Sequence, residues 1–470
     1  MSGLFTTLNS SVKALNAHSR AIETAGKNLA NVNNAAYARQ RVIYGDRGTV
    51  VTPEGAQSLG LEALGVQQLR DTLLDRQVTR EIALKSMFET EQSALERAEA
   101  GLGQNIDRST AASAAGSNAS TGGLAAAIDD FFNAFQGLAA RPTDAGERQT
   151  LLQKAAILVD RFQLTDGRLA QAQTDIDTSI ANDVSEVNRL LSTIADLNAQ
   201  IGRIEIGNPG GAIDLRDQRQ ARIEELSAKI PFEVRDTTDG QVGLVMRDAA
   251  NAEVVLVDLA TVTGPVTFTG TGLTAGSPAT AVEISSGSIR GALNARDGAI
   301  QTLRSDLDLL ARQLATSVNA AYNPAGAGSN FFAATSLTAG SLRLESGLDS
   351  LSLRAGTGSA GDNSLALAVA GLATKSFATA GGDVIDGTLG QHYARAVSNL
   401  GQALASASAR AEDQGNIERL VRTQRDSVSG VSLDEEMADL VRYQRAFQAS
   451  SRVFSVVDEL LDTVVNRLGR

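Results

Sequence analysis

The sequence lacks cysteine and tryptophan, and its 470 residues include only two histidines and seven prolines. Without cysteine, disulfide bonds, thiolate metal sites and cysteine nucleophiles are excluded together. Aromatic residues make up only 4% of the chain, whereas hydrophobic residues as a whole make up 43%. This composition provides for a core and argues against wholesale disorder, and it suits long, thin helical packing better than one thick globular core.

Basic charge is also scarce. Lysine and arginine total 42 against 54 acidic residues, which gives a net charge of -12 at pH 7. We find no run of basic residues that could form the patch required by duplex nucleic acid or an anionic membrane. No apolar run is long enough to span a bilayer, and the start, Met1 to Thr7, lacks the basic and apolar parts of a secretory signal peptide. We expect neither nucleic acid binding nor membrane insertion.

Residues for catalysis or metal binding do not come together in the sequence. His18 lies in a helical heptad pattern and is interpreted as a packed or interface residue. His392 has no partner at a ligand spacing and is interpreted as an ordinary surface residue. The adjacent acids at 434–436 point in different directions on one helical turn. The glycines at 101–103 and 207–211 follow predicted helices, not the strands that precede a phosphate loop. We therefore predict no catalytic, cofactor-binding or metal-binding residue, and no enzyme.

The clearest pattern is a heptad repeat at each end of the chain. Such a repeat predicts a helix that packs along a narrow seam. Ser432 followed by Glu435 predicts a capping box at the start of the last helix. The predicted subunit-contact residues are Leu4, Leu8, Leu15, Ile22, Leu29 and Val32 near the N-terminus, where Ser11, His18 and Ala25 complete the seam, and Leu433, Met437, Leu440, Phe447, Phe454, Val457, Leu461 and Leu468 near the C-terminus.

Two arrangements would bury these stripes. The first and last helices could close an ordinary bundle within one chain, or each could pair with copies in other subunits; both could also occur together. If fully buried, each apolar seam residue would contribute about 1.5–3 kcal/mol. An exposed stripe of this kind favours association.

Between the ends, the pattern changes from helical to extended and back. Residues 42–75 favour extended segments, residues 101–123 a loop, and the stripe from Ile128 to Leu138 a helix packed in the core. A helix pair is predicted at 176–204 and 212–230. The later predicted elements are strands at 232–234, 242–246, 254–257 and 266–268 with a turn at Asp239-Gly240, a helix from Ile289 that Asn323-Pro324 ends, short strands at 342–344 and 351–353, and a helical block from Ser364 that is interrupted near 378–388.

Four segments resemble a known family. Gly26–Asn33 with Tyr37–Arg41 resembles the N-terminal signature of flagellar rod, hook and hook-associated proteins, and Ser429–Ser450 closely resembles the end of the hook-associated protein 1 (FlgK) family. Ala212–Ser227 and Gly287–Asn319 look like internal stretches of that family. One departure is Asn34-Ala35-Ala36, where the family usually has Thr-Pro-Gly. Without this turn signal the first helix could continue further.

The resemblance implies a mainly α fold with inserted β structure and a nested arrangement of domains. The implied domains are a terminal coiled-coil domain (1–60 and 425–470), a helical domain (61–231 and 287–424, with 323–363 as an alternative part of an outer insertion), and a β-rich inserted domain (232–286).

The implied function is a structural subunit of the extracellular bacterial flagellum. It would assemble at the hook–filament junction through the terminal helices after export without a cleaved signal peptide. The implied partners are further copies of the chain, the hook protein, hook-associated protein 3 and an export chaperone on the C-terminal helix; no cofactor is implied. The hook protein or another axial component, and a secreted coiled-coil filament or adhesin, remain the alternatives.

Overall fold

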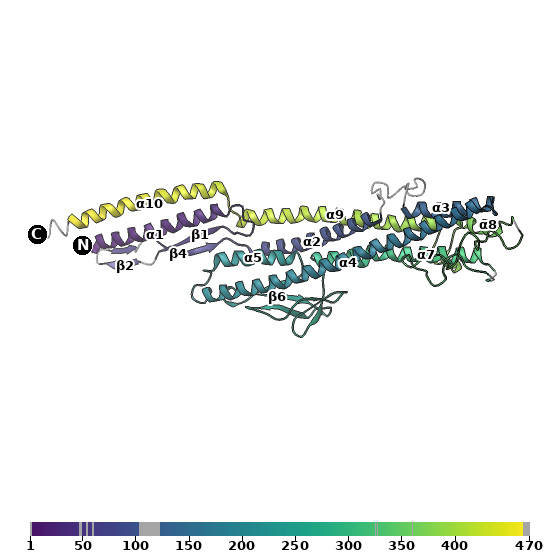
Figure 1. Ribbon diagram of the computed structural model, residues 1–470. Helices are drawn as coiled ribbons and strands as arrows, with labels where there is room; N and C mark the ends of the chain where they lie inside the picture. Colours follow the sequence, from purple (N-terminus) through teal and green to yellow (C-terminus); the bar gives the residue numbers. More distant parts are fainter. Residues whose placement is uncertain are drawn as a thin grey trace. The chain divides into compact units, whose positions relative to one another are not determined.

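The computed structural model of the chain describes residues 2–46, 49–52, 55–58, 61–102, 123–324, 326, 328–359 and 361–463 (Figure 1). Long helices predominate, and small antiparallel sheets lie between them in the sequence, which confirms the predicted fold class. The long helices are α1 (Ser2–Ala30), α2 (Thr72–Leu102), α3 (Gly123–Ala140), α4 (Ala145–Glu205), α7 (Gln301–Tyr322), α9 (Leu389–Ser429) and α10 (Leu433–Asp462).

The chain divides into two compact units. The terminal unit comprises Met1–Leu84, Val184–Ser285 and Gly415–Arg470, and the middle unit comprises Lys85–Asp183 and Ser286–Gln414. Helices α2, α4 and α9 contribute residues to both units. The three-domain boundaries drawn from the sequence stay a prediction.

In the terminal unit, α1 and α10 lie side by side and run in opposite directions (Figure 1). Strands β1 (Gln40–Asp46) and β4 (Leu61–Gln68) form an antiparallel pair that also packs against α1. Strands β2 (Thr49–Thr52) and β3 (Gly55–Ser58) form a second antiparallel pair. Helix α1 therefore has both a helix and a β-hairpin as packing neighbours within the same chain.

The bend after α1 is made without proline or glycine. Helix α1 ends at Ala30, and the Asn34 side-chain oxygen accepts a hydrogen bond from the Ala36 amide at 3.2 Å. An asparagine that bonds the backbone two residues further on forms a turn of its own. The Tyr37 amide then donates to the Asn34 carbonyl at 3.0 Å, so the first helix does not continue as the missing turn signal allowed.

The β insertion follows the pair formed by α4 and α5 (Ile213–Ser227). A four-stranded antiparallel sheet has the order β5-β6-β7-β8, and a three-stranded sheet has the order β11-β10-β9. Asp239 and Gly240 both have positive φ, as a tight hairpin turn requires, which confirms the predicted turn. The strands are β5 (Glu233–Asp236), β6 (Val242–Arg247), β7 (Glu253–Asp258), β8 (Thr261–Val262), β9 (Thr267–Phe268), β10 (Leu273–Ala275) and β11 (Thr280–Val282).

Two asparagines, the buried Asn198 and the half-buried Asn188, fix this insertion to α4. Asn198 donates to the carbonyls of Val242 and Leu259 at 2.7 and 2.6 Å, and Asn188 exchanges two hydrogen bonds of 2.8 Å with the backbone of Val266. Strands β8, β10 and β11 have only two or three residues, too few to show the alternation by which a strand is predicted.

The middle unit has an aromatic core. Phe131 and Phe135 of α3 lie 5.6 and 5.3 Å from Phe331, ring centroid to centroid, and all three are fully buried. The predicted core role of the α3 stripe is confirmed. Helix α6 (Ser288–Ala295) continues through a π-helical segment (Arg296–Ile300) into α7, which ends before Asn323 as predicted. Helix α8 (Ser364–Ala370) completes the described helices of this unit.

The short strands expected in this region do not form. At 342–344 there is only an isolated bridge between Phe332 and Leu344. At 351–353 the Asp349 side chain accepts hydrogen bonds from the amides of Leu351 and Ser352, so the backbone turns instead of extending. Most of the loop predicted at 101–123 lies outside the described residues.

Candidate functional site

The predicted contact residues of α1 lie beside its buried face and not at its centre. Leu8, Leu15, Ile22, Leu29 and Val32 are half-buried, and the Leu4 side chain lies outside the described residues. The most buried positions of α1 fall mainly one residue before the predicted seam, at Ala17, Ala21, Thr24 and Asn28, with Ser11 and Ala25 of the seam also buried.

On α10 the apolar residues divide between two faces. Val457 and Leu461 are buried, Leu440 and Phe454 are half-buried, and Leu433, Met437 and Phe447 are exposed. Leu468 lies outside the described residues. Among the described residues of α10, seven large apolar side chains remain exposed although α1 packs on this helix. Leu433 and Phe447 are two of them, and the other five are hereafter called the exposed α10 stripe: Met437, Val441, Val453, Val456 and Leu460.

A buried asparagine connects the ends of the chain. Asn28, 1% exposed, donates to the Gln40 carbonyl at 2.9 Å and to Glu436 Oε2 at 3.0 Å. Its oxygen accepts hydrogen bonds from the Tyr37 hydroxyl at 2.8 Å and the Gln40 amide at 3.0 Å. We call Asn28, Tyr37, Arg39, Gln40 and Glu436 the base clamp, because they join the end of α1, the start of β1 and the first turn of α10.

Arg39 completes the base clamp with charge. Its Nε lies 2.7 Å from Oε1 of the buried Glu436, and its Nη1 lies 2.7 Å from Glu435 Oε2. The Ser432 side chain makes no capping hydrogen bond, so the predicted capping box is wrong. In a capping box the Glu435 carboxylate would bond the Ser432 amide, but here it pairs with Arg39. Burial, and then the carboxylates of Asp217, Asp214 and Glu436, raise the pKa of Tyr37, so its hydroxyl stays protonated as the donor to Asn28.

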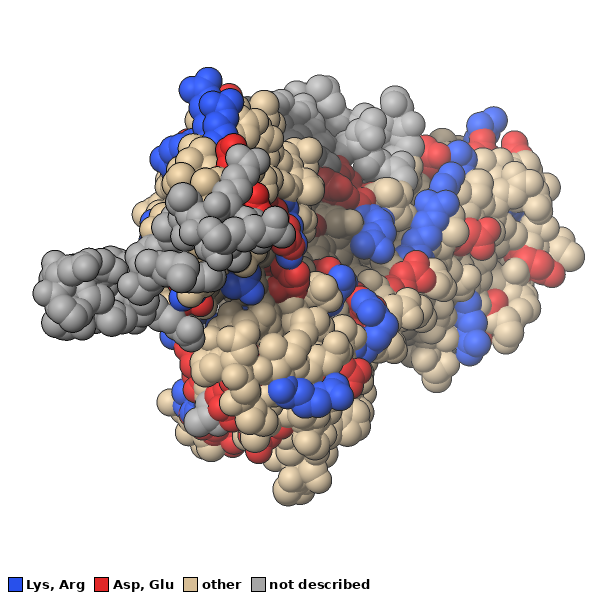
Figure 2. All heavy atoms as spheres, turned by 90° about the vertical axis from the view of Figure 1, so that its left-hand side faces the viewer, with Lys and Arg blue, Asp and Glu red and all other residues tan. Residues whose placement is uncertain are grey.

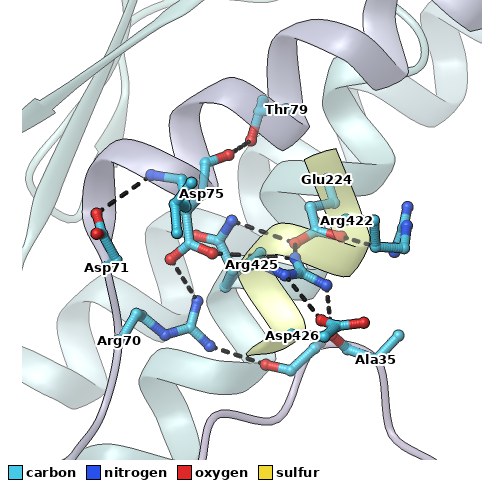
Figure 3. Close-up of polar contacts among 12 residues, drawn as sticks. Ala35, Arg70, Asp71, Asp75, Thr79, Glu224, Arg422, Arg425 and Asp426 are labelled. Carbon is cyan, nitrogen blue, oxygen red and sulfur yellow. Dashed lines mark hydrogen bonds and ion pairs between the residues drawn. The ribbon is translucent and has the colours of Figure 1, made fainter. Parts of the chain in front are cut away.

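A second polar cluster, the arginine network, lies in the same unit (Figure 3). Arg425 near the end of α9 pairs with Glu224 of α5 at 2.7 Å and donates to the Ala35 carbonyl at 2.8 Å. Arg70 pairs with Asp75 at 3.0 Å and with Asp217 at 2.6 Å, and it donates to the Ala36 carbonyl at 2.8 Å. The arginine network consists of Arg70, Asp75, Asp217, Glu224 and Arg425.

The arginine network holds charge away from water. Arg425 and Asp217 are 4% and 6% exposed. Burial raises the pKa of Asp217 to about 6, although the Arg70 guanidinium beside it acts in the opposite direction. Both arginines reach carbonyls of the turn after α1, so they fix that turn to α2, α5 and α9. Arrangements of this kind stabilise one geometry, because removing one partner leaves a buried charge uncompensated.

The histidines have ordinary surroundings. His18 is half-buried, burial lowers its pKa, and its Nδ1 has no hydrogen-bond partner. His392 Nε2 lies 3.3 Å from the Asp306 carbonyl. Among the described residues, no three His, Cys, Asp or Glu side chains gather as a metal site would require, and no helix is long and apolar enough to cross a membrane. On the face drawn in Figure 2, acidic and basic side chains are interspersed.

The sequence matches known flagellar proteins along its length. Residues 115–332 match the model of the flagellar hook-associated protein FlgK helical domain. Residues 422–468 match the model of the flagellar basal body rod FlgEFG protein C-terminal region. Flagellar hook-associated protein 1 of Bacillus subtilis is 26% identical, and the alignment covers 100% of this chain and 99% of that protein. The proteins of the same name from Salmonella typhimurium and Escherichia coli are each 24% identical, over 98% of this chain and 99% of theirs.

Along its whole length, the chain is thus similar to the hook-associated protein 1 (FlgK) family. It is therefore a structural component of the bacterial flagellum. A solved structure, the flagellar hook junction protein FlgK from Burkholderia pseudomallei, is similar over 55% of this chain and 46% of that one, with a TM-score of 0.45 and 20% identity; the similarity thus spans less than half of that chain.

The family signatures coincide with the two polar clusters. The N-terminal signature supplies Asn28, Tyr37, Arg39 and Gln40, and the C-terminal signature supplies Glu436. Asp217 and Glu224 lie in the first internal FlgK-like stretch. The resemblance rested on these stretches as a whole, and none of their polar residues was predicted to have a role. The available signal was that polar residues stand within the family-like segments.

Proposed function

We propose that this chain assembles with its neighbours at the hook–filament junction, and that the exposed α10 stripe makes part of the contact. The observation that carries the proposal is that α10 keeps Met437, Val441, Val453, Val456 and Leu460 exposed while its other face packs on α1. An apolar stripe left in water favours association. Val456 and Leu460 are 56% and 50% exposed, so burying what remains of each would contribute on the order of 1 kcal/mol.

The pairing of α1 with α10 changes how the terminal helices would act. The sequence left two arrangements open, a bundle closed within one chain or pairing between subunits. The proposal combines them: the base clamp holds α1 and α10 together in each subunit, and the outer side of this pair meets other subunits. Assembly would then join preformed pairs, which lowers the entropy cost compared with ordering each helix on binding.

The remaining parts of the proposal follow from the family. The partners would be further copies of the chain, the hook protein and hook-associated protein 3, with an export chaperone on the C-terminal helix before assembly. Export would use no cleaved signal peptide, and the chain would have no enzymatic activity. A place in the hook itself is the alternative, and immunogold labelling of intact flagella separates the two: label confined to the hook–filament boundary supports the junction, and label along the hook contradicts it.

The contact role of the stripe is tested by the double variant Val456→Asp/Leu460→Asp. Both side chains are exposed, so the purified monomer should keep its helical circular dichroism and its melting temperature. Cells carrying the variant should release unpolymerised filament protein into the medium. The matched control is Gln448→Asp, which adds a charge at an exposed polar position of the same helix. Normal filaments in the double variant would remove the stripe from the contact.

A variant between the two faces of α10 separates the pairing of α1 and α10 within one subunit from the contact with other subunits. Leu440 is half-buried, so Leu440→Asp would disturb the pair of α1 and α10 within one subunit as well as any contact outside it. Loss of assembly in Leu440→Asp together with normal assembly in the double variant would assign the defect to the pair itself. Equal loss in both, with only the double variant keeping the monomer fold, supports the outer contact.

A further inference from the structure

A cavity of about 670 Å³ opens in the terminal unit, apart from the exposed α10 stripe. Its walls are the end of β4, the first turns of α2, the start of α5 and the hairpin between β5 and β6. Four arginines line it, Arg70, Arg76, Arg216 and Arg219, together with two aspartates, Asp75 and Asp236. The lining therefore carries an excess of two positive charges in a chain whose net charge is -12.

Arg219 is the unusual member of this lining. It is 8% exposed, and its Nη1 donates to the Asn198 side-chain oxygen at 2.8 Å and to the Gly240 carbonyl at 2.7 Å. Both acceptors are neutral, and Arg219 has no ion pair among the described residues. Burial lowers its pKa to about 10, which leaves it charged at neutral pH. A buried cation with only neutral acceptors is costly unless an anion can approach it.

The nearby carboxylates are already engaged by other arginines. Glu205 holds Arg216 through two hydrogen bonds of 2.7 and 2.5 Å, and Asp236 pairs with Arg76 at 2.6 Å. Asp75 and Asp217 both pair with Arg70. Even so, the buried Nε of Arg70 has no hydrogen-bond partner. Arg70 thus keeps one hydrogen-bond donor without an acceptor, and Arg219 keeps a charge that no described carboxylate pairs with.

The walls are built closely around these groups. Gly240, at φ +69°, forms part of the lining, and a side chain there would collide with Glu205 and Arg216. The Arg76–Asp236 pair is more than half exposed on both sides, so it lies where solvent reaches the cavity. The Glu205 side chain is only 2% exposed and fixes the direction of Arg216. Guanidinium groups held in this way are suited to oxyanions, which they bind through paired, charge-assisted hydrogen bonds.

We propose that this cavity is a binding site for a small oxyanion of the phosphate or dicarboxylate class, and that Arg219 is its principal ligand. The lining holds two more arginines than aspartates, but Glu205 and Asp217 pair with Arg216 and Arg70 from outside the lining. Arg219 is therefore the lining cation that no described carboxylate pairs with. The site is independent of the proposed contact surface on α10, because no residue of that stripe lines the cavity.

The experiment titrates the full chain with inorganic phosphate and, separately, with succinate by isothermal calorimetry in low-salt buffer. We expect saturable binding of at least one of them at one site per chain. Arg219→Gln should weaken it on the order of ten-fold or more, as expected for the loss of a charged hydrogen-bond donor. The matched control is Arg222→Gln on the same helix; Arg222 pairs with Glu225, does not line the cavity, and should leave the affinity unchanged.

Circular dichroism and thermal melting of each variant check that it folds. If Arg219→Gln does not fold, Arg76→Gln takes its place, because Arg76 is exposed and its loss should lower the affinity several-fold without exposing a core. Saturable binding that the lining variant weakens and Arg222→Gln does not supports the site. Absence of saturable binding for both anions, or equal weakening by Arg222→Gln, overturns it.

Discussion

Replacing Asn28 by alanine should loosen the join between α1 and α10. The side chain is 1% exposed and makes four hydrogen bonds, two as donor and two as acceptor, to Gln40, Tyr37 and Glu436. Alanine fits the helix well, so the change removes the bonds and leaves the helical backbone in place. The affected quantity is the free energy that keeps the base clamp closed.

The size of the effect follows from those bonds. A typical hydrogen bond contributes a net 0.5–1.5 kcal/mol or so, and one to a charged group about 1.5–3 kcal/mol. In Asn28→Ala the buried Tyr37 hydroxyl and Gln40 amide also lose their acceptor. Since Glu436 keeps Arg39 as a partner, we expect a loss of about 3–5 kcal/mol in the free energy of local opening, less than the sum of separate losses.

Hydrogen exchange followed by mass spectrometry measures this opening directly. Amides in the second half of α1 and the first turns of α10 should exchange about 100-fold faster or more in Asn28→Ala, since each 1.4 kcal/mol is about a factor of ten. The matched control is Asn31→Ala three residues later, whose side chain bonds only the Lys27 carbonyl and Asn34 near the surface and should cost about 0.5 kcal/mol or less. Equal exchange in the two variants would refute the role given to Asn28.

Three further predictions concern stability. Arg425→Met should cost about 3–5 kcal/mol in urea unfolding, because the Glu224 side chain, only 11% exposed, loses its closest cation, whereas Arg419→Met at an exposed site of the same helix should be nearly neutral. The raised pKa of Asp217, about 6 in the folded chain against about 3.9 unfolded, stabilises the fold below pH 4 and loses this effect as the pH rises through 6. Between pH 4 and 7 the free energy of unfolding of the wild type should therefore fall by about 2–3 kcal/mol relative to that of Asp217→Asn. The exposed-site variant Asp196→Asn is the control, and an equal fall relative to both variants would contradict the role given to Asp217. In the middle unit, Gly291→Ala would push a side chain into the Met87 carbonyl and should lower the melting temperature, with a cost of about 1–3 kcal/mol, whereas Gly298→Ala meets no neighbouring atom and should not.

The sequence predicted the helices because periodicity is local. The α3 stripe, the helix pair ending before Pro231 and the stop at Asn323 all follow from residues close together in the chain, and the structure has each of them. The predicted buried face of α1 lies one residue too late in the sequence, because it was placed from the large apolar residues. The most buried positions are instead small residues such as Ala17 and Ala21. Small residues let neighbouring elements approach closely but give no apolar stripe of their own.

The base clamp and the arginine network could not be derived from periodicity at all. Their members are polar residues whose partners lie in other parts of the chain: Gln40 reaches Asp214, and Arg425 reaches the turn at Ala35. A polar residue inside a helical pattern is by default read as solvent-facing, and nothing local marks Asn28 as buried. The capping box failed for the same reason, since a distant arginine competes for Glu435.

The hydrogen bond from Asn28 to Glu436 spans 408 positions of the chain. During synthesis, the N-terminal helix therefore leaves the ribosome long before the residue that locks it is made. Loop closure over such a distance is slow, so the terminal unit is completed late, after the contacts within α3 and α4 have had time to form. In a nascent or truncated chain that stops short of α10, the base clamp cannot form and the first helix lacks its packing partner. Such a chain would be a natural substrate for proteases and chaperones.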